Sequence, residues 1–297
     1  MPNNISDFQN PNQHPNLNEI KMAPPIATQI NVQGDAQATK HAQIICEIQD
    51  RIAYVTISNP ERLNAINMAM WNALSAHFTE LNRNTELRCI IIRGANRNFA
   101  AGADVQEFAT VRNTLADGMR YHNQVIATAL KAISECQHPV VAAIEGVCVG
   151  GGLEIAIASD IRIAAPNSRF GIPINKLGFP LAPQEMQSLL ALVGKAVSLE
   201  ILLEGRILNA IEAKNKGLVQ RLSDNVPLEA LETAERIAKG APLAARINKK
   251  IIRRLSFMPT PLNEQEQLDA FSFLETSDYQ EGILGFLAKK TPEFTGK

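Results

Sequence analysis

Short apolar segments alternate with segments of helical spacing through the first half of this chain. Segment 68–81 repeats its apolar residues with a helical period, and the strand-like segments are 43–58, 89–93, 139–144 and 160–164. Helices that connect neighbouring strands cover the sheet, so both faces of such a sheet are buried. The alternation therefore predicts an α/β fold with a mostly parallel sheet, or a solenoid of such units.

The two ends of the chain differ from this middle part. Residues 1–40 are rich in Asn, Gln and Pro without an apolar period, which predicts a disordered tail. That tail contains neither Arg nor an apolar stretch, so a mitochondrial or secretory leader is not expected. After about residue 209 the spacing becomes helical. We therefore divide the chain into a tail (1–40), a core (41–215) and a helical C-terminal region (216–297).

Charge, cysteine content and hydropathy exclude several classes of function. The net charge is −1 and aromatic residues are 5%, so neither a basic field nor a stacking platform for nucleic acid is expected. The four cysteines are widely spaced, which indicates reduced thiols in a cytoplasmic protein. No apolar run of membrane length is seen, so no membrane partner is expected. Single histidines such as His122 lack metal-ligand spacing, so we expect no metal and a structural or surface role.

Two glycine-containing turns, at 99–104 and 146–154, each follow a strand and open a helix. Backbone N–H groups at the start of a helix are unpaired and favour negative charge. Neither turn has the spacing G-x-G-x-x-G, so a dinucleotide site is disfavoured. Two facing N–H donors instead suit a carbonyl that becomes an oxyanion, and a tight turn without a ligand is the alternative.

Several motifs, spaced along nearly all of the chain after the tail, resemble the crotonase superfamily, which is the enoyl-CoA hydratase/isomerase group. They are Asn59-Pro60 with Leu63-Asn64-Ala65-Ile66, segment 90–105, segment 138–164, Phe170-Gly171-Ile172-Pro173, Lys176-Leu177-Gly178, and Ser277-Asp278 with Glu281-Gly282. The resemblance implies a crotonase-type spiral of ββα units followed by a helical oligomerisation region. It also implies a homo-oligomer, either a trimer or a dimer of trimers.

The resemblance further implies a ligand and a set of site residues. The ligand is an acyl-CoA thioester, with coenzyme A as part of the substrate and no separate cofactor. The backbone N–H groups of Ala103 and Gly151 match the oxyanion hole of the family, and Glu154 matches one of its two catalytic glutamates. The residues matched to substrate or CoA binding are Arg62, Leu63, Ala65, Ala101, Gly102, Asp104, Gly150, Ile174, Phe286 and Lys289. For Phe286 and Lys289, which would act from a neighbouring subunit, the alternative is an amphipathic helix with a solvated lysine.

Glu154 opens an apolar segment that we expect to form a buried helix. A buried carboxylate is costly unless it has a partner or a function. The positive end of the helix dipole is expected to hold the pKa of Glu154 down against desolvation. A carboxylate that only satisfies free N–H groups at the helix start is the alternative.

The chain departs from the family at the second glutamate, because the position after Phe-Gly-x-Pro holds Ile174. Water addition between two carboxylates is therefore in doubt. Gln184 and Glu185 lie in the altered loop that follows and are candidates to replace it, although we favour a solvated helix start for Glu185. The expected function is enoyl-CoA hydration with Glu154 as both base and acid. The alternatives are an isomerase, dehydratase or decarboxylase of this family, a non-catalytic acyl-CoA-binding protein, and an assembly protein.

Overall fold

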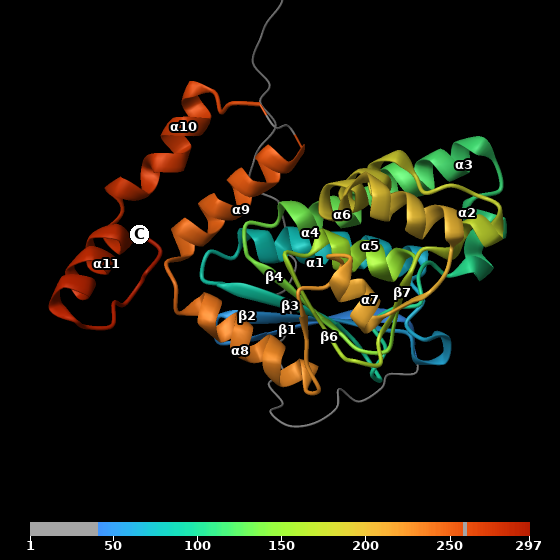
Figure 1. The fold of residues 1–297 in the computed structure, drawn as a ribbon, viewed down its shortest axis with the longest axis horizontal. Coiled ribbons are helices and arrows are strands. Elements are labelled where there is room, and N and C mark those ends of the chain that lie inside the picture. The colour runs from blue at the N-terminus through green and yellow to red at the C-terminus, as the bar shows by residue number, and fades with distance from the viewer. Residues whose placement is uncertain (1–40, 258–259) are drawn as a thin grey trace, which may run out of the picture. The chain divides into compact units, whose positions relative to one another are not determined.

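The computed structural model describes residues 41–257 and 260–297, and the predicted tail at 1–40 lies outside them. A six-stranded sheet organises this part of the chain (Figure 1), and its strands in spatial order are β1 (Gln43–Gln49), β2 (Ile52–Ser58), β3 (Cys89–Gly94), β4 (Val140–Ile144), β6 (Ile161–Ala164) and β9 (Arg221–Leu222). β1 and β2 form an antiparallel hairpin, and every other neighbouring pair in this sheet is parallel. The predicted mostly parallel sheet is confirmed.

Alternate residues of the central strands face opposite sides of the sheet, as the period of a strand requires. In β3, Ile90 and Ile92 join a large apolar cluster, whereas Cys89 and Ile91 join a smaller cluster on the other face. The helices that contribute to the large cluster include α1 (Met68–Arg83), α4 (Ala127–Glu135) and α5 (Gly151–Ala158). The smaller cluster packs under α8 (Val226–Ala238). Because both faces of the sheet are buried, the sequences of these strands are continuous apolar runs.

A second, three-stranded sheet has the order β5 (Val147–Val149), β7 (Arg169–Gly171) and β8 (Leu208–Asn209). The remaining helices are α2 (Phe108–Val111), α3 (Leu115–Arg120), a π-helix at Tyr121–Ile126, α6 (Pro183–Glu204), α7 (Ala210–Asn215), α9 (Pro242–Phe257), α10 (Glu264–Phe271) and α11 (Ser277–Ala288). Short 3-10 turns lie at Pro60–Arg62, Val105–Glu107, Pro173–Leu177 and Ser272–Glu275. The sequence pattern did not predict the small sheet, because strands of two or three residues show no readable period.

Strand β9 lies inside the C-terminal region that the sequence predicted to be helical. It pairs in parallel with β6, and Arg162 of β6 reinforces that junction by donating to the carbonyl of Leu218 at 3.0 Å. The same buried guanidinium also donates to the carbonyls of Ala156 and Ser159 at the end of α5. The core sheet therefore continues to Leu222, seven residues past the boundary predicted at 215/216, and α8 covers it.

The expectation that no apolar segment is long enough to span a membrane is wrong for helix α6, which has 22 residues. Among the described residues it is the one helix long and apolar enough, by length and composition, to cross a membrane. Helices of soluble proteins pass the same test, so a single one is weak evidence. Gly194 interrupts α6 with a non-helical backbone at φ 72°, which divides it into two shorter helices.

Candidate active site

A short parallel bridge joins the two glycine turns that the sequence singled out. The N–H of Ala100 donates to the carbonyl of Val147 at 2.9 Å, and the N–H of Val149 donates to the carbonyl of Ala100 at 3.0 Å. Next to this bridge, the N–H of Phe99 donates to the carbonyl of Glu145 at 2.8 Å. Since the chain runs in the same direction through both segments, residues just after the bridge, at 101–104 and 150–152, are brought together.

Two backbone N–H groups at this junction are left without a backbone acceptor. Ile66 bridges to the first turn through Gly102 and Asp104, so the N–H of Ala103 between them points away from that bridge. Gly151 is the first residue of α5, where an N–H has no intrahelical acceptor. The two donors are close, because a Cβ placed on Gly151 would lie 3.4 Å from the nitrogen of Ala103. This geometry matches an oxyanion hole.

The donors open into a cavity of about 100 Å³. The predicted site residues that line it are Ala101, Gly102, Ala103, Gly150, Gly151, Glu154 and Ile174. Its other walls combine aliphatic side chains with three aromatic ones, Phe108, Tyr121 and Phe179. The ring of Phe108 meets those of Tyr121 and Phe179 edge to face, with centroids 6.2 and 6.1 Å apart. Arg112 stacks on two of these rings, at 4.5 Å from the centroid of Phe108 and 4.1 Å from that of Phe179. The site is therefore an apolar pocket with few polar groups, as small-molecule sites usually are.

Two carboxyl groups face this cavity, and the sequence analysis expected one. Glu154 is 8% exposed and Glu185, at the start of α6, is 4% exposed. Glu185 is therefore not a solvated helix-start residue, and that expectation is wrong. His122, which the sequence analysis expected to be a structural or surface residue, also lines the cavity, and its Nδ1 lies 2.8 Å from Oε1 of Glu185.

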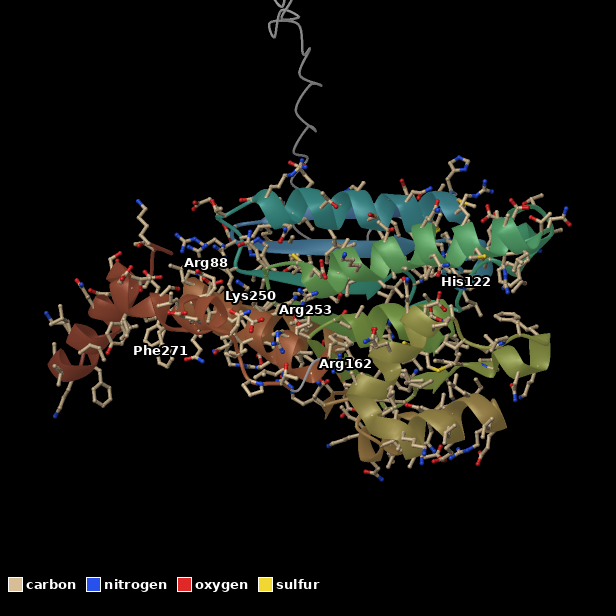
Figure 2. All side chains as sticks on the ribbon, turned by 90° about the horizontal axis from the view of Figure 1, so that it is seen from above. Arg88, His122, Arg162, Lys250, Arg253 and Phe271 are labelled. Atoms are coloured by element: carbon tan, nitrogen blue, oxygen red, sulfur yellow. The ribbon has the colours of Figure 1, made fainter. Side chains whose placement is uncertain are left out.

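The segment that carries His122 is a π-helix, Tyr121–Ile126, between α3 and α4. π-Helical turns are rare and frequently occur at functional sites. Here the turn brings the rings of Tyr121 and His122 to 5.3 Å, both at the cavity. In Figure 2, His122 lies on the right of the view, far from Phe271 of α10 on the left.

Sequence reasoning missed the contact between His122 and Glu185 because 63 positions separate them. An acidic residue in the first turn of a helix is a common capping feature, so Glu185 carried no distinctive local signal. The available signal was the loss of the expected glutamate at Ile174, which pointed to a replacement among Gln184 and Glu185. Of these two residues only Glu185 lines the cavity, since Gln184 is exposed and does not line it.

Burial raises the pKa of the Glu154 carboxyl well above its usual value of 4.5, and the nearby charge of Glu185 raises it further. The expectation that the helix dipole would hold this pKa down is therefore wrong. The reason is that desolvation of a carboxylate in an apolar pocket outweighs a partial charge at the helix start. The raised pKa also indicates that the two carboxyl groups are close enough to interact.

Replacing Glu154 by Gln is expected to raise the melting temperature, increasingly so from about pH 5 to pH 8. A carboxyl with a raised folded-state pKa binds more protons when folded. Its contribution to the free energy of unfolding is fully present below the unfolded pKa, near 4.5, and is lost as pH rises through the folded-state pKa. Thermal unfolding of both proteins across this range measures the effect, with the exposed Glu264→Gln as control. A difference that does not grow with pH contradicts the burial argument.

The other predicted binding residues flank the cavity or lie away from it. Arg62 forms an ion pair with Asp104 at 2.5 Å, and the N–H of Ala101 donates to the carbonyl of Leu63 at 3.0 Å. These two contacts connect the turn that contains Ala65 to the first glycine turn. The turn itself, including Arg62, Leu63 and Ala65, does not line the cavity.

Phe286 and Lys289 lie at the end of α11 and do not line the cavity of their own chain. Phe286 is 82% exposed, and Lys289 ends the helix in a left-handed conformation at φ 53°. Their contribution to the site of a neighbouring subunit stays a prediction. Within residues 41–257 and 260–297, no cluster of three or more His, Cys, Asp or Glu side chains could hold a metal ion.

Comparison with known proteins adds to this geometry. The family model described as enoyl-CoA hydratase/isomerase matches residues 47–297. A Mycobacterium tuberculosis protein named probable enoyl-CoA hydratase is 35% identical over 256 residues, covering 85% of this chain and 97% of the relative. The 2,3-dehydroadipyl-CoA hydratase of Escherichia coli is 31% identical over 259 residues, covering 86% of this chain and all of the relative, 100%. The crystal structure of an enoyl-CoA hydratase/carnithine racemase from Magnetospirillum magneticum aligns with a TM-score of 0.83 at 43% identity, covering 86% of this chain and 96% of that one.

Proposed function

Because this chain belongs to the enoyl-CoA hydratase/isomerase family, we propose that it adds water across the double bond of a trans-2-enoyl-CoA thioester. The crotonase-type α/β fold that the resemblance implied is confirmed. The observation that carries the proposal is the meeting of two unpaired N–H donors, from Ala103 and Gly151, with the carboxyl group of Glu154 in one small cavity.

The proposed chemistry follows from that arrangement. The thioester oxygen accepts from the N–H groups of Ala103 and Gly151, and these bonds strengthen as the oxygen becomes an enolate. Removing one such donor in other enzymes costs about 10²- to 10³-fold in rate. Glu154 exchanges a proton with the α carbon of the acyl group, and its burial favours the neutral form that carries this proton.

The test is turnover of trans-2-butenoyl-CoA by the purified protein, followed as loss of the conjugated thioester absorbance. Hydration that depends on enzyme concentration supports the proposal. Binding of the thioester without any loss of absorbance contradicts it and favours an isomerase, a decarboxylase or a non-catalytic binding protein.

Isomerisation of the double bond is the second candidate, because Ile174 stands where the family has its second glutamate. Moving a proton between two carbons needs only one carboxyl group, which Glu154 supplies. A gain of conjugated absorbance from trans-3-hexenoyl-CoA, without hydration of the 2-enoyl product, would identify this reaction.

We also propose that the chain forms a homo-oligomer, either a trimer or a dimer of trimers, through its C-terminal helices. Helices α10 and α11 expose large apolar side chains, namely Leu268, Phe271, Leu284, Phe286 and Leu287. Such a concentration of exposed apolar surface is typical of an interface. In this assembly Phe286 and Lys289 would reach the CoA of a neighbouring subunit, with the turn at Arg62, Leu63 and Ala65 on the adenosine side. Light scattering coupled to size exclusion measures the oligomeric state.

A further inference from the structure

We propose that Glu185 is a second catalytic residue, the base that takes a proton from the attacking water, and that His122 positions it. The proposal rests on the hydratase function above and assigns the role of the missing glutamate at Ile174 to a residue of a different helix. Its basis is the geometry of one cavity, which Glu154, Glu185 and His122 all line.

The two carboxyl groups are held in different ways. Oε1 of Glu185 lies 2.8 Å from Nδ1 of His122, and it accepts from the N–H of the Nδ1-protonated tautomer of His122. In the part of the chain that the structure describes, no side-chain or backbone donor reaches the carboxyl group of Glu154. Glu185 is therefore held at the cavity by a hydrogen-bonding partner, whereas burial favours the neutral, proton-carrying form of Glu154. These different surroundings assign the base role to Glu185 and the acid role to Glu154.

The contact with His122 also limits where Glu185 can move. Both side chains are largely buried, with 3% of the Glu185 side chain and 18% of the His122 side chain exposed. Glu185 is anchored in the first turn of α6, which begins with Pro183, and His122 comes from the π-helical turn. Two separate elements thus hold one carboxylate at the cavity, and a solvated helix start would need no such support.

The proposed reaction balances with these groups alone. The water oxygen bonds to the β carbon while the Glu185 carboxylate takes one water proton. The π electrons of the double bond move to the thioester oxygen, and the N–H groups of Ala103 and Gly151 stabilise the resulting enolate. The carbonyl then re-forms as the α carbon takes the proton of the Glu154 carboxyl. Transfer of the new proton from Glu185 to the Glu154 carboxylate restores the starting state.

Two readouts on Glu185→Gln test this division of roles. The first is hydration of trans-2-butenoyl-CoA, which needs a base for water, and we expect kcat to fall by about 10²- to 10⁴-fold. The second is exchange of the α protons of butanoyl-CoA in D₂O, followed by NMR, which needs only Glu154 and the oxyanion donors. We expect that exchange to keep at least about a third of the wild-type rate, since a general base for water plays no part in it and loss of the Glu185 charge makes Glu154 easier to ionise.

Control variants separate catalysis from folding. Gln184→Ala, at the exposed neighbouring position, is expected to keep both activities. His122→Leu is expected to lower hydration through kcat, and His122→Asn, which still offers an N–H to Glu185, is expected to recover most of that loss. A merely structural role for His122 would not distinguish hydration from exchange.

The possible outcomes are distinct. Wild-type enzyme that exchanges α protons but does not hydrate contradicts the proposed function itself. Wild-type enzyme that hydrates, together with Glu185→Gln at undiminished kcat, overturns the role of Glu185 alone. Equal loss of hydration and exchange in a folded Glu185→Gln protein also overturns it, because the residue would then not act on water selectively.

Discussion

Glu154→Gln is expected to lower kcat for hydration of trans-2-butenoyl-CoA by about 10²- to 10⁴-fold, the usual worth of a positioned acid or base. Glutamine keeps the size of the side chain and its place among apolar neighbours but cannot carry the proton that the α carbon receives. KM is expected to change little, because the N–H groups of Ala103 and Gly151 still hold the thioester. Steady-state kinetics on wild type and variant measure both constants.

The same variant is expected to lose exchange of the α protons of butanoyl-CoA, and this separates Glu154 from Glu185. Thermal unfolding serves as the folding control, since Glu154→Gln is expected to be at least as stable as wild type near neutral pH. Full activity of a folded Glu154→Gln protein would show that another group carries the proton, even if the family assignment holds.

Gly151→Ala is expected to lower kcat by about 10²- to 10³-fold, as loss of an oxyanion donor does in other enzymes. A Cβ at this position would lie 2.8 Å from Cζ2 of Trp71, closer than real Cβ contacts allow. Trp71 is fully buried in the core and cannot easily give way, so the start of α5 must shift. That shift moves the Gly151 N–H away from the thioester oxygen.

Gly118→Ala in α3 is the matched control, because a Cβ there meets nothing within 4 Å. It is expected to leave kcat unchanged and to stabilise the helix slightly, since Ala is a better helix former than Gly. Thermal unfolding of both variants separates a local displacement from general destabilisation. Wild-type turnover by Gly151→Ala would mean that the N–H of this residue does not contact the reacting oxygen.

Local sequence signals predicted the elements that make the frame of the site. The strand over 140–144 is an apolar run buried on both faces, and the segment that begins α5 is apolar on every side. The composition of each segment was therefore enough to predict that it is buried. The helical spacing after about residue 209 likewise indicated C-terminal helices such as α7 and α9. The two glycine turns marked the segments that meet at the cavity, because only small residues suit such a close approach of backbone segments.

Distant contacts could not be predicted in this way. Nothing in the segment that contains His122 indicates a contact with Glu185. Neither residue belongs to a periodic apolar pattern that would predict which way its side chain faces. Strand β9 escaped prediction for a related reason, because two residues become a strand only through their partner β6. The length of α6 was also missed, since polar residues interrupt its apolar pattern.

The sequence by itself determined the α/β class, the two glycine turns and Glu154 as a buried carboxyl group, because each depends on residues that are neighbours in the chain. The tertiary structure alone decided that a second carboxyl group lies in the cavity, and it reversed the expected direction of the Glu154 pKa shift. Desolvation and coupling between charges depend on everything packed around a group, and most of what surrounds Glu154 comes from distant parts of the chain.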